Sequence, residues 1–228
     1  MNLHQAKVKT HDLACVKMKE EKLIEELRLK LGCELPGLSS QLKAAPPFRA
    51  GSFSEEDVRV ARRASVVWVM YPNNGEWEGV LIKRAPYDGV HSKQIGLPGG
   101  ERDDGDKNDV DTAIRECFEE IGVQLIETDI IGALTPLYIP PSKFFVRPFV
   151  ACLPCKPKFI LDEVEVSEVL TLSLDRLCSE DLWRDYKMKG IVVPGFELDG
   201  NVVWGATAMM LAELSDCCRD IFRGTFAS

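Results

Sequence analysis

The chain has 228 residues, 45% of them hydrophobic and 28% charged, which is the composition of a globular protein. Its formal net charge of −8 at pH 7 leaves no fold-wide basic surface, so we expect no nucleic-acid partner. The sequence has neither an apolar run of about 18 residues nor the apolar core of a signal peptide, so we expect no membrane span and no secretion.

The first predicted element is a helix in KEEKLIEELRLKLG, residues 19–32. Gly32 is its predicted stop. Four apolar side chains share one helical face: Leu23, Ile24, Leu27 and Leu31. The next residues, 33–53, are rich in Pro, Gly and Ser and predict an irregular connection. We therefore divide the chain into an N-terminal extension with one helix, residues 1–50, and a main domain, residues 51–228.

The main domain is predicted to begin with a β-hairpin. SEEDVRVARR, residues 54–63, forms either one helical turn or the lead-in to a strand. ASVVWVMYP, residues 64–72, is rich in β-formers and nearly all apolar. NNGEWE then predicts a turn, and GVLIKR, residues 79–84, predicts the returning strand.

The middle of the chain predicts one amphipathic helix between a loop and further strands. The loop is APYDGVHSKQIGLPGG, and the helix runs from about Asp109 to Ile121, where Gly122 ends it. DIIGALTPLYI and KFFVRPFVACL carry β-type patterns and are separated by Pro140 and Pro141. EVSEVLTLSLDRL predicts a strand that leads into a helix start.

The last predicted element is a helix over residues 201–222, NVVWGATAMMLAELSDCCRDIF, which is apolar at helical spacing. We expect Trp204 in this segment to belong to the core, because apolar residues surround it. Non-alternating strands with about three helices predict an α+β fold, an α/β/α sandwich in which helices flank a mixed β-sheet.

The cysteines give no strong metal or redox signal. Of the eight, Cys152 and Cys155 form a C-x-x-C pair. A structural zinc site needs a second pair at similar spacing, and the adjacent Cys217 and Cys218 do not supply one. Without a secretory signal, we expect reduced thiols and a cytoplasmic protein.

The acidic residues of the central helix are crowded on one face. Glu119 and Glu120 lie within about 60° of Glu116 around the helix axis. The opposite, core-facing side is predicted to carry four residues: Ile114, Cys117, Phe118 and Ile121. Like charges one turn apart destabilise a helix by about 0.2–0.5 kcal/mol per pair. The three glutamates therefore either form a solvated face or bind a cation.

A hard divalent cation favours carboxylate, carbonyl and water oxygens, and it commonly shares them with a substrate phosphate. LPGG, residues 97–100, precedes the helix and can turn tightly toward a ligand because glycine tolerates positive φ. LPGG is followed, in fixed order, by R-E-x-x-E-E-x-G. This combination favours a bound cation over a solvated face as the reason for the crowded carboxylates.

This segment resembles the Nudix box, whose usual pattern is G-x5-E-x7-R-E-U-x-E-E-x-G-U, where U is bulky and apolar. The closing half, RECFEEIGV, is intact from Arg115 to Val123. The opening half departs, because the five residues that follow Gly100 lead to Asp106 instead of Glu, and eight residues instead of seven then precede Arg115.

The longer spacing with Asp resembles the coenzyme A diphosphatase branch, which has boxes of the type GGKRDxxDxDDxxTALREAxEE. VLIKRAPYDGVHSKQIGLPGG resembles the signature upstream of the box in that branch, and LPGLSSQLKAAPPFRA its N-terminal lead. YIPPSKFFVRPFV, EVSEVLTLSLDRL and VWGATAMML resemble its C-terminal parts, so the resemblance spans about residues 20–222. Two positions differ: the branch's Arg falls on Gly89, and its Gly falls on Lys93.

The resemblance implies hydrolysis of a nucleoside diphosphate derivative with Mg²⁺ or Mn²⁺. Coenzyme A or its thioesters would give phosphopantetheine and 3′,5′-ADP. The alternative is another small-molecule nucleotide substrate, such as a nucleotide sugar, a dinucleotide or a nucleoside triphosphate. A non-catalytic sensing module is disfavoured because all three box glutamates are present.

The resemblance also implies roles for the box residues. Glu116, Glu119 and Glu120 are the expected metal ligands, with the carbonyl of Gly100. Arg115 is expected to pair with a helix carboxylate and hold it in place. The group that orients the attacking water stays open between Glu116, Glu119 and a later loop carboxylate, for which the candidates are Glu163 and Glu165. Asp106 is either an outer metal contact or a loop residue near the helix start.

Outside the box, Lys83 and Arg84 end the strand that leads into the substrate loop. They are either phosphate contacts or exposed strand-end charges. We expect His91 to be a packing residue of the loop. The resemblance also suggests a possible homodimer through the helix around Leu23–Leu31, which could equally pack on its own domain.

Overall fold

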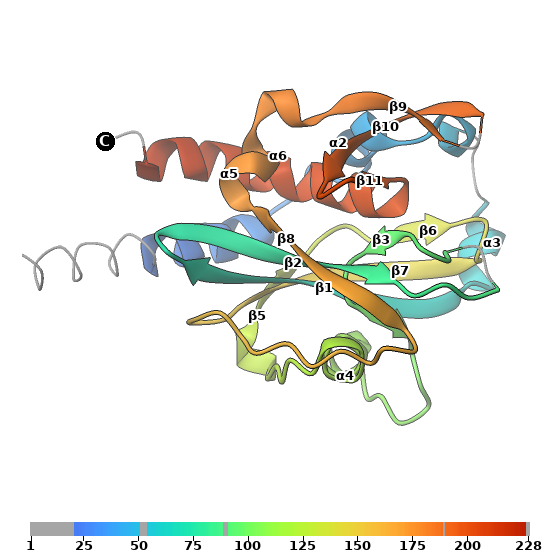
Figure 1. The fold of residues 1–228 in the computed structure, drawn as a ribbon, viewed down its shortest axis with the longest axis horizontal. Coiled ribbons are helices and arrows are strands. Elements are labelled where there is room, and N and C mark those ends of the chain that lie inside the picture. Colours follow the sequence, from blue (N-terminus) through green and yellow to red (C-terminus); the bar gives the residue numbers. More distant parts are fainter. Residues whose placement is uncertain (1–20, 51–53, 89–90, 189, 227–228) are drawn as a thin grey trace, which may run out of the picture.

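The protein folds as a β-sheet covered by helices on both faces (Figure 1). A computed structural model describes residues 21–50, 54–88, 91–188 and 190–226. Helix α4 (Asp109–Ile121) covers one face of the sheet, and α6 (Ala206–Phe226) lies over the other (Figure 1). This arrangement confirms the predicted α+β fold.

The main sheet is mixed and, within the described residues, contains eight strands. Strand β1 is at its centre, parallel to β7 and antiparallel to β2 and β4. The strands are β1 (Arg62–Asn73), β2 (Glu76–Arg84), β3 (Ile95–Gly96), β4 (Gly99–Glu101), β5 (Ile130–Ala133), β6 (Leu137–Ile139), β7 (Phe144–Cys152) and β8 (Val166–Ser173). A second sheet contains β9 (Arg184–Met188), β10 (Ile191–Leu198) and β11 (Asn201–Trp204).

Several short helices precede the first strand or lie between later elements. They are α2 (Leu38–Gln41), α3 (Glu55–Arg59) and α5 (Leu174–Cys178), with the 3₁₀ turns η1 (Leu42–Ala44), η2 (Pro47–Ala50), η3 (Glu127–Asp129) and η4 (Glu180–Leu182). Both alternatives for residues 54–63 are present: Ser54 caps α3 in a capping box with Asp57, and β1 already begins at Arg62. None of the described helices is apolar over the length that a bilayer span needs.

The predicted hairpin is present, but its turn is shorter than expected. Asn73 pairs with Glu76 across β1 and β2, which leaves Asn74 and Gly75 as a two-residue turn. Their φ angles of 53° and 87° are the positive values that Asn-Gly adopts easily in such turns. The strand therefore resumes at Glu76, inside the segment predicted as turn.

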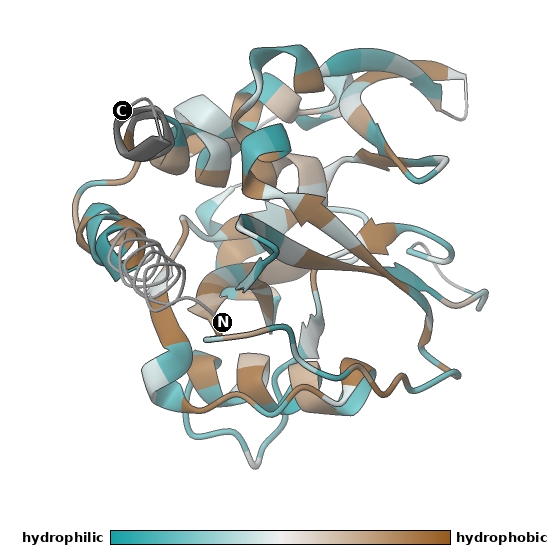
Figure 2. Ribbon diagram, turned by 60° about the vertical axis from the view of Figure 1, so that its left-hand side comes forward, coloured by the Kyte–Doolittle hydropathy of each residue, from teal (hydrophilic) through white to brown (hydrophobic). Residues whose placement is uncertain are grey.

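Two apolar cores lie on opposite faces of the sheet. The smaller packs α4 against β1, β2 and β7, and the larger packs α6 against the other face. Hydrophobic segments run along the central strands in Figure 2. Leu23 and Leu27, in the helix of residues 21–31, are each 1% exposed within the larger core. Of the two roles left open for this helix, the structure therefore shows packing on its own domain.

Buried Glu213 ties the N-terminal segment to α6. Its carboxylate accepts hydrogen bonds from the Gly37 N–H (3.1 Å), the Gln41 side-chain amide (2.9 Å) and the Thr135 hydroxyl (2.6 Å). These bonds satisfy a charge that would be costly to bury alone.

Two sequence predictions are corrected by the fold. Residues 201–204 form strand β11 and not the start of the last helix, because Val202 and Val203 pair with β10. Gly205, with φ of 68°, turns the chain so that α6 begins at Ala206. Phe118 is 51% exposed and not part of the core, because Cys117 and Ile121 occupy the centre of the buried stripe of α4.

Candidate active site

Helix α4 has well-defined ends that place the acidic face beside β4. The Asn108 side chain accepts hydrogen bonds from the N–H groups of Val110 (2.8 Å) and Asp111 (3.0 Å), so it caps the start. Gly122 ends the helix with φ of 68°, as predicted. A side chain there would meet Ile160, since an added Cβ would lie 2.8 Å from the Ile160 Cβ.

Arg115 joins the helix to the acidic loop before it. Its Nε and Nη2 donate to the two oxygens of Asp106 at 3.0 and 2.9 Å. Its Nη1 donates to Glu116 Oε1 and to Glu119 Oε2, each at 2.8 Å, and Nη2 also donates to the Glu101 carbonyl at 3.0 Å. The guanidinium therefore spans three carboxylates and one backbone carbonyl.

Both carboxylate oxygens of Asp106 accept hydrogen bonds from neighbouring residues. Besides Arg115, it accepts from the Thr112 hydroxyl and the Asp103 N–H, each at 2.9 Å. The hydrogen bonds from Arg115 hold the pKa of Asp106 well below its usual range. Of the two roles left open for Asp106, these contacts support that of a loop residue that anchors the helix start.

Glu120 is a buried carboxyl group, with a side chain 1% exposed. Its Oε2 accepts the Gly99 N–H at 2.7 Å, while its Oε1 lies 3.3 Å from Nη1 of Arg84 and finds no hydrogen-bond partner in the described part of the chain. Burial raises the pKa of Glu120 to about 7, although Arg84 and the Gly99 N–H oppose this rise.

Glu116 and Glu119 occupy different surroundings from Glu120. Glu116 lies against Gly100, where an added Cβ would be 2.4 Å from Glu116 Oε2, and burial raises its pKa. Glu119 has a side chain that is 55% exposed. In the described residues, no three His, Cys, Asp or Glu side chains converge on one metal position. The expected cluster is therefore not preformed, because Arg115 holds Glu116 and Glu119 while Arg84 faces Glu120.

One of the two candidate loop carboxylates lies near these glutamates. The negative charge of Glu165 contributes to the raised pKa values of Glu116 and Glu120. Its loop is fixed to α4, because the Asp162 N–H donates to the Glu120 carbonyl at 3.0 Å. Glu163 and Glu165 are both exposed, but of the two only Glu165 contributes to these pKa shifts, which favours Glu165 as the candidate.

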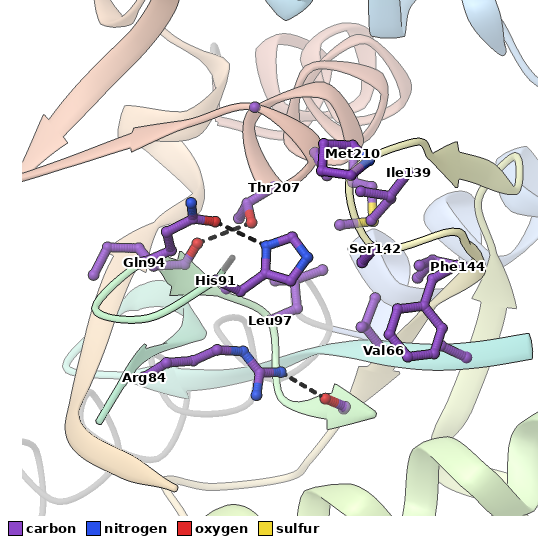
Figure 3. Close-up of a pocket in the computed structure, with 18 of the residues that line it drawn as sticks. Val66, Arg84, His91, Gln94, Leu97, Ile139, Ser142, Phe144, Thr207 and Met210 are labelled. Atoms are coloured by element: carbon purple, nitrogen blue, oxygen red, sulfur yellow. Dashed lines mark hydrogen bonds between the residues drawn. The ribbon is translucent and has the colours of Figure 1, made fainter. Parts of the chain in front are cut away.

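A cavity of about 500 Å³ lies on the other side of β4. Arg84, Gly99 and Gly100 line it together with apolar side chains, which include Val66, Leu97, Ile139, Phe144 and Met210. Figure 3 shows these side chains around the cavity, with Arg84 donating to the Gly99 carbonyl at 2.9 Å. Strand β4 therefore separates a mostly apolar cavity from the acidic helix, and Arg84 reaches both.

Comparison with known proteins identifies the family. A model of the NUDIX domain matches residues 61–188, which is more than half of the chain. The chain belongs to the Nudix hydrolase family. It is therefore a hydrolase that acts on phosphoanhydride bonds, here of a nucleoside diphosphate derivative.

The sequence relatives and the fold agree with this assignment. The uncharacterized Nudix hydrolase NudL of Yersinia pestis is 29% identical over 142 residues, which cover 60% of this chain and 70% of NudL. NudL of Yersinia pseudotuberculosis matches equally well. A MutT/nudix family protein from Enterococcus faecalis has a similar fold, with a TM-score of 0.53 at 14% identity over 78% of this chain and 67% of that one.

Nudix hydrolases generally require a divalent metal ion, and the residues of this Nudix box fit one. The buried Oε1 of Glu120 has no hydrogen-bond partner among the described residues, and Gly100 leaves the space that the Glu116 carboxylate occupies. Carboxylate oxygens are the donors that Mg²⁺ and Mn²⁺ prefer. Metal binding at Glu120 would have to draw its carboxylate from Arg84, whereas Arg115 holds Glu116 through Oε1 alone.

Three residues outside the Nudix box lie close to the cavity or to β2. Lys83 is 3.8 Å from Glu168, its partner across β2 and β8, and is not among the described residues that line the cavity, whereas Arg84 is. His91 lines the cavity, and its Nδ1 lies 3.0 Å from Gln94 Oε1. Trp204, expected in the core, is instead half-buried because it ends β11 at the cavity edge.

The described cysteines form no disulfide bond with one another. The reduced state of the thiols stays a prediction from the sequence.

Two cavity residues, Arg49 and Ser142, were not identified from the sequence. Arg49 is in the segment predicted as irregular connection, and Ser142 is in the turn between β6 and β7, where nothing local marks a role.

Proposed function

We propose that this Nudix hydrolase cleaves the diphosphate linkage of coenzyme A or its thioesters. Water would add across the P–O–P bridge and give phosphopantetheine and 3′,5′-ADP. One observation carries the proposal: β4 presents Gly99 and Gly100 both to the carboxylates of α4 and to a mostly apolar cavity of about 500 Å³. A substrate with a diphosphate between two bulky groups suits a site divided in this way.

The proposed metal ligands are Glu116, Glu119 and Glu120, with the carbonyl of Gly100. A bound Mg²⁺ or Mn²⁺ would neutralise the diphosphate oxygens and lower the pKa of a coordinated water. Arg115 keeps two of these carboxylates in place through its hydrogen bonds of 2.8 Å to Glu116 and Glu119.

Arg84 is the proposed phosphate contact. Its Nη2 donates to the Gly99 carbonyl, and its Nη1 faces Glu120 at 3.3 Å. When Glu120 turns to a cation, the guanidinium fork becomes available to a phosphate oxygen at the cavity mouth. Glu116, Glu119 and Glu165 remain the candidates for orienting the attacking water, and the electrostatic effect of Glu165 on Glu116 supports its inclusion.

The backbone at Lys93 supports the coenzyme A branch. Lys93 occupies the position where that branch has Gly, and its φ is 60°. The left-handed conformation that glycine adopts freely is therefore retained despite the substitution. The second departure, at Gly89, lies outside the described residues.

The second candidate is the same chemistry on another nucleoside diphosphate derivative, namely a nucleotide sugar, a dinucleotide or a nucleoside triphosphate. Gly89 favours it, because the coenzyme A branch has Arg at this position and a glycine offers no cation to an anionic substrate.

The deciding experiment is product analysis by mass spectrometry. The protein is incubated with coenzyme A, ADP-ribose, NADH and a nucleoside triphosphate, with Mg²⁺ and with Mn²⁺, beside Glu120→Gln. We expect phosphopantetheine from coenzyme A with the wild type and not with the variant. Preferred cleavage of ADP-ribose, NADH or the triphosphate would replace the coenzyme A assignment by the second candidate.

A further inference from the structure

Two polar side-chain atoms of cavity-lining residues have no hydrogen-bond partner in the described part of the chain. Arg49, in η2, and Ser142, in the turn between β6 and β7, both line the cavity. Arg49 Nη2 and Ser142 Oγ are buried, and neither has a hydrogen bond to any residue that the structure describes. Buried polar atoms without partners are uncommon in folded proteins, and where their residues line a cavity a bound ligand is one explanation for them.

The charge of Arg49 is also uncompensated. Within the described chain, Arg49 forms no ion pair, whereas Arg62 nearby pairs with Glu101 at 2.9 Å. Burial lowers the pKa of Arg49 to about 10, so the guanidinium still carries its charge at neutral pH. A buried cation without an anion costs free energy, and a bound anion would recover it.

Local contacts place both side chains beside the β6–β7 hairpin. Arg49 Nη1 donates to the Tyr138 carbonyl in β6, which orients the guanidinium. Ile139 and Phe144 pair across β6 and β7, so Ser142 lies in the turn that closes this hairpin. Figure 3 shows Ser142 beside Ile139 and Phe144, away from Arg84. The cavity therefore has cationic side chains from two separate elements, Arg84 on β2 and Arg49 on η2.

We propose that Arg49 and Ser142 bind a second anionic group of the substrate, a phosphomonoester, while its diphosphate lies at Arg84 and the Nudix box. The guanidinium and hydroxyl supply the donors that a phosphate accepts. This inference rests on the proposed function, since the only phosphomonoester of coenzyme A is its 3′-phosphate. Arg49 would then distinguish coenzyme A from a dinucleotide without such a group.

The binding test needs no turnover. Binding of 3′,5′-ADP and of 5′-AMP is measured by calorimetry in the presence of a chelator, for the wild type, Arg49→Gln, Ser142→Ala and Arg59→Gln. We expect the wild type to bind 3′,5′-ADP about tenfold to a hundredfold more tightly than 5′-AMP, as for a charge-assisted hydrogen-bonded contact. Arg49→Gln should remove most of that preference and Ser142→Ala a smaller part.

Matched controls separate this role from a loss of structure. Arg59 is exposed on α3 and pairs with Glu56 at 2.7 Å, so Arg59→Gln should keep the full preference. Ser142 Oγ has no hydrogen bond to lose within the described structure, so Ser142→Ala should keep its thermal stability even if Arg49→Gln does not fold. In kinetics, Arg49→Gln should raise KM for coenzyme A, with kcat and the KM for 3′-dephospho-coenzyme A nearly unchanged.

The outcomes distinguish this inference from the proposed function. Equal binding of 3′,5′-ADP and 5′-AMP by the wild type, or no binding of either, would overturn the anion site. An equal loss for both nucleotides in Arg49→Gln would also overturn it. Failure to cleave coenzyme A, with the 3′,5′-ADP preference intact and dependent on Arg49, would refute the proposed substrate and leave the phosphomonoester site standing.

Discussion

The substitution Glu120→Gln tests whether the buried carboxyl group lowers the stability of the fold while it supports hydrolysis. The carboxyl group is buried, and its burial raises the pKa from an ordinary 4.5 to about 7. Glutamine has nearly the same shape, and its carbonyl oxygen can still accept the Gly99 N–H. We expect the variant to lose hydrolysis and, in the absence of metal, to be more stable than the wild type at alkaline pH.

The sign and the size of this stability difference follow from proton linkage. Above pH 4.5 the unfolded chain releases the Glu120 proton, while the folded protein keeps it up to about pH 7. The wild type therefore loses stability as pH rises through this window, and glutamine does not. The full difference corresponds to about 3 kcal/mol at 1.36 kcal/mol per pH unit. For a protein of this size, that is about 6–12 °C in Tm.

Thermal unfolding by circular dichroism, in a chelator at pH 5 and pH 8, measures this effect. The Tm difference between Glu120→Gln and the wild type should be larger at pH 8 by several degrees. Glu119→Gln is the matched control, because its side chain is 55% exposed and solvent screening keeps its contribution within about 1 kcal/mol. A difference for Glu120→Gln that is the same at both pH values would refute the argument that burial of this charge is costly.

Three further predictions test the surroundings of this carboxylate. Gly100→Ala should lower kcat about a hundredfold in an otherwise folded protein, because the new Cβ would lie 2.4 Å from Glu116 Oε2; unchanged kcat would show that Glu116 needs no fixed position. Lys93→Gly should raise the free energy of unfolding in urea by about 0.5–1 kcal/mol, because it relieves φ of 60°; a loss would contradict strain there. Arg84→Met should raise the pKa of Glu120 above about 7, since Arg84 opposes the effect of burial, and so extend to higher pH the range over which Tm falls in a chelator; an unchanged range would separate the two groups.

The sequence predicts best what local chemistry decides. Helix α4 was predicted from Asp109 to Ile121, with Gly122 after it, because the apolar period and the terminal glycine are both local signals. Strand β11 was missed, because an apolar stretch that continues into α6 carries no local sign that Gly205 divides it. Its strand character comes from pairing with β10, which is a tertiary contact.

The same limit applies to the site. Glu119 and Glu120 are adjacent and identical in type, yet one is more than half exposed and the other is buried under Arg84 and Gly99. No property of the helix alone separates them. Arg49 and Ser142 are 93 positions apart in the sequence and meet the same cavity only because η2 packs against the β6–β7 hairpin.

The ion pair between Arg115 and Asp106 bears on the unusual length of the Nudix box in this chain. Aspartate is one methylene shorter than the glutamate of the usual Nudix pattern, and the loop here has one residue more before Arg115. Hydrogen bonds of 2.9–3.0 Å between Arg115 and Asp106 close the loop. They fix the position of the Asp106 carboxylate, whatever the number of loop residues. The departure from the usual pattern thus leaves Arg115 with a carboxylate partner in this chain, and a search by strict residue count would overlook such a box.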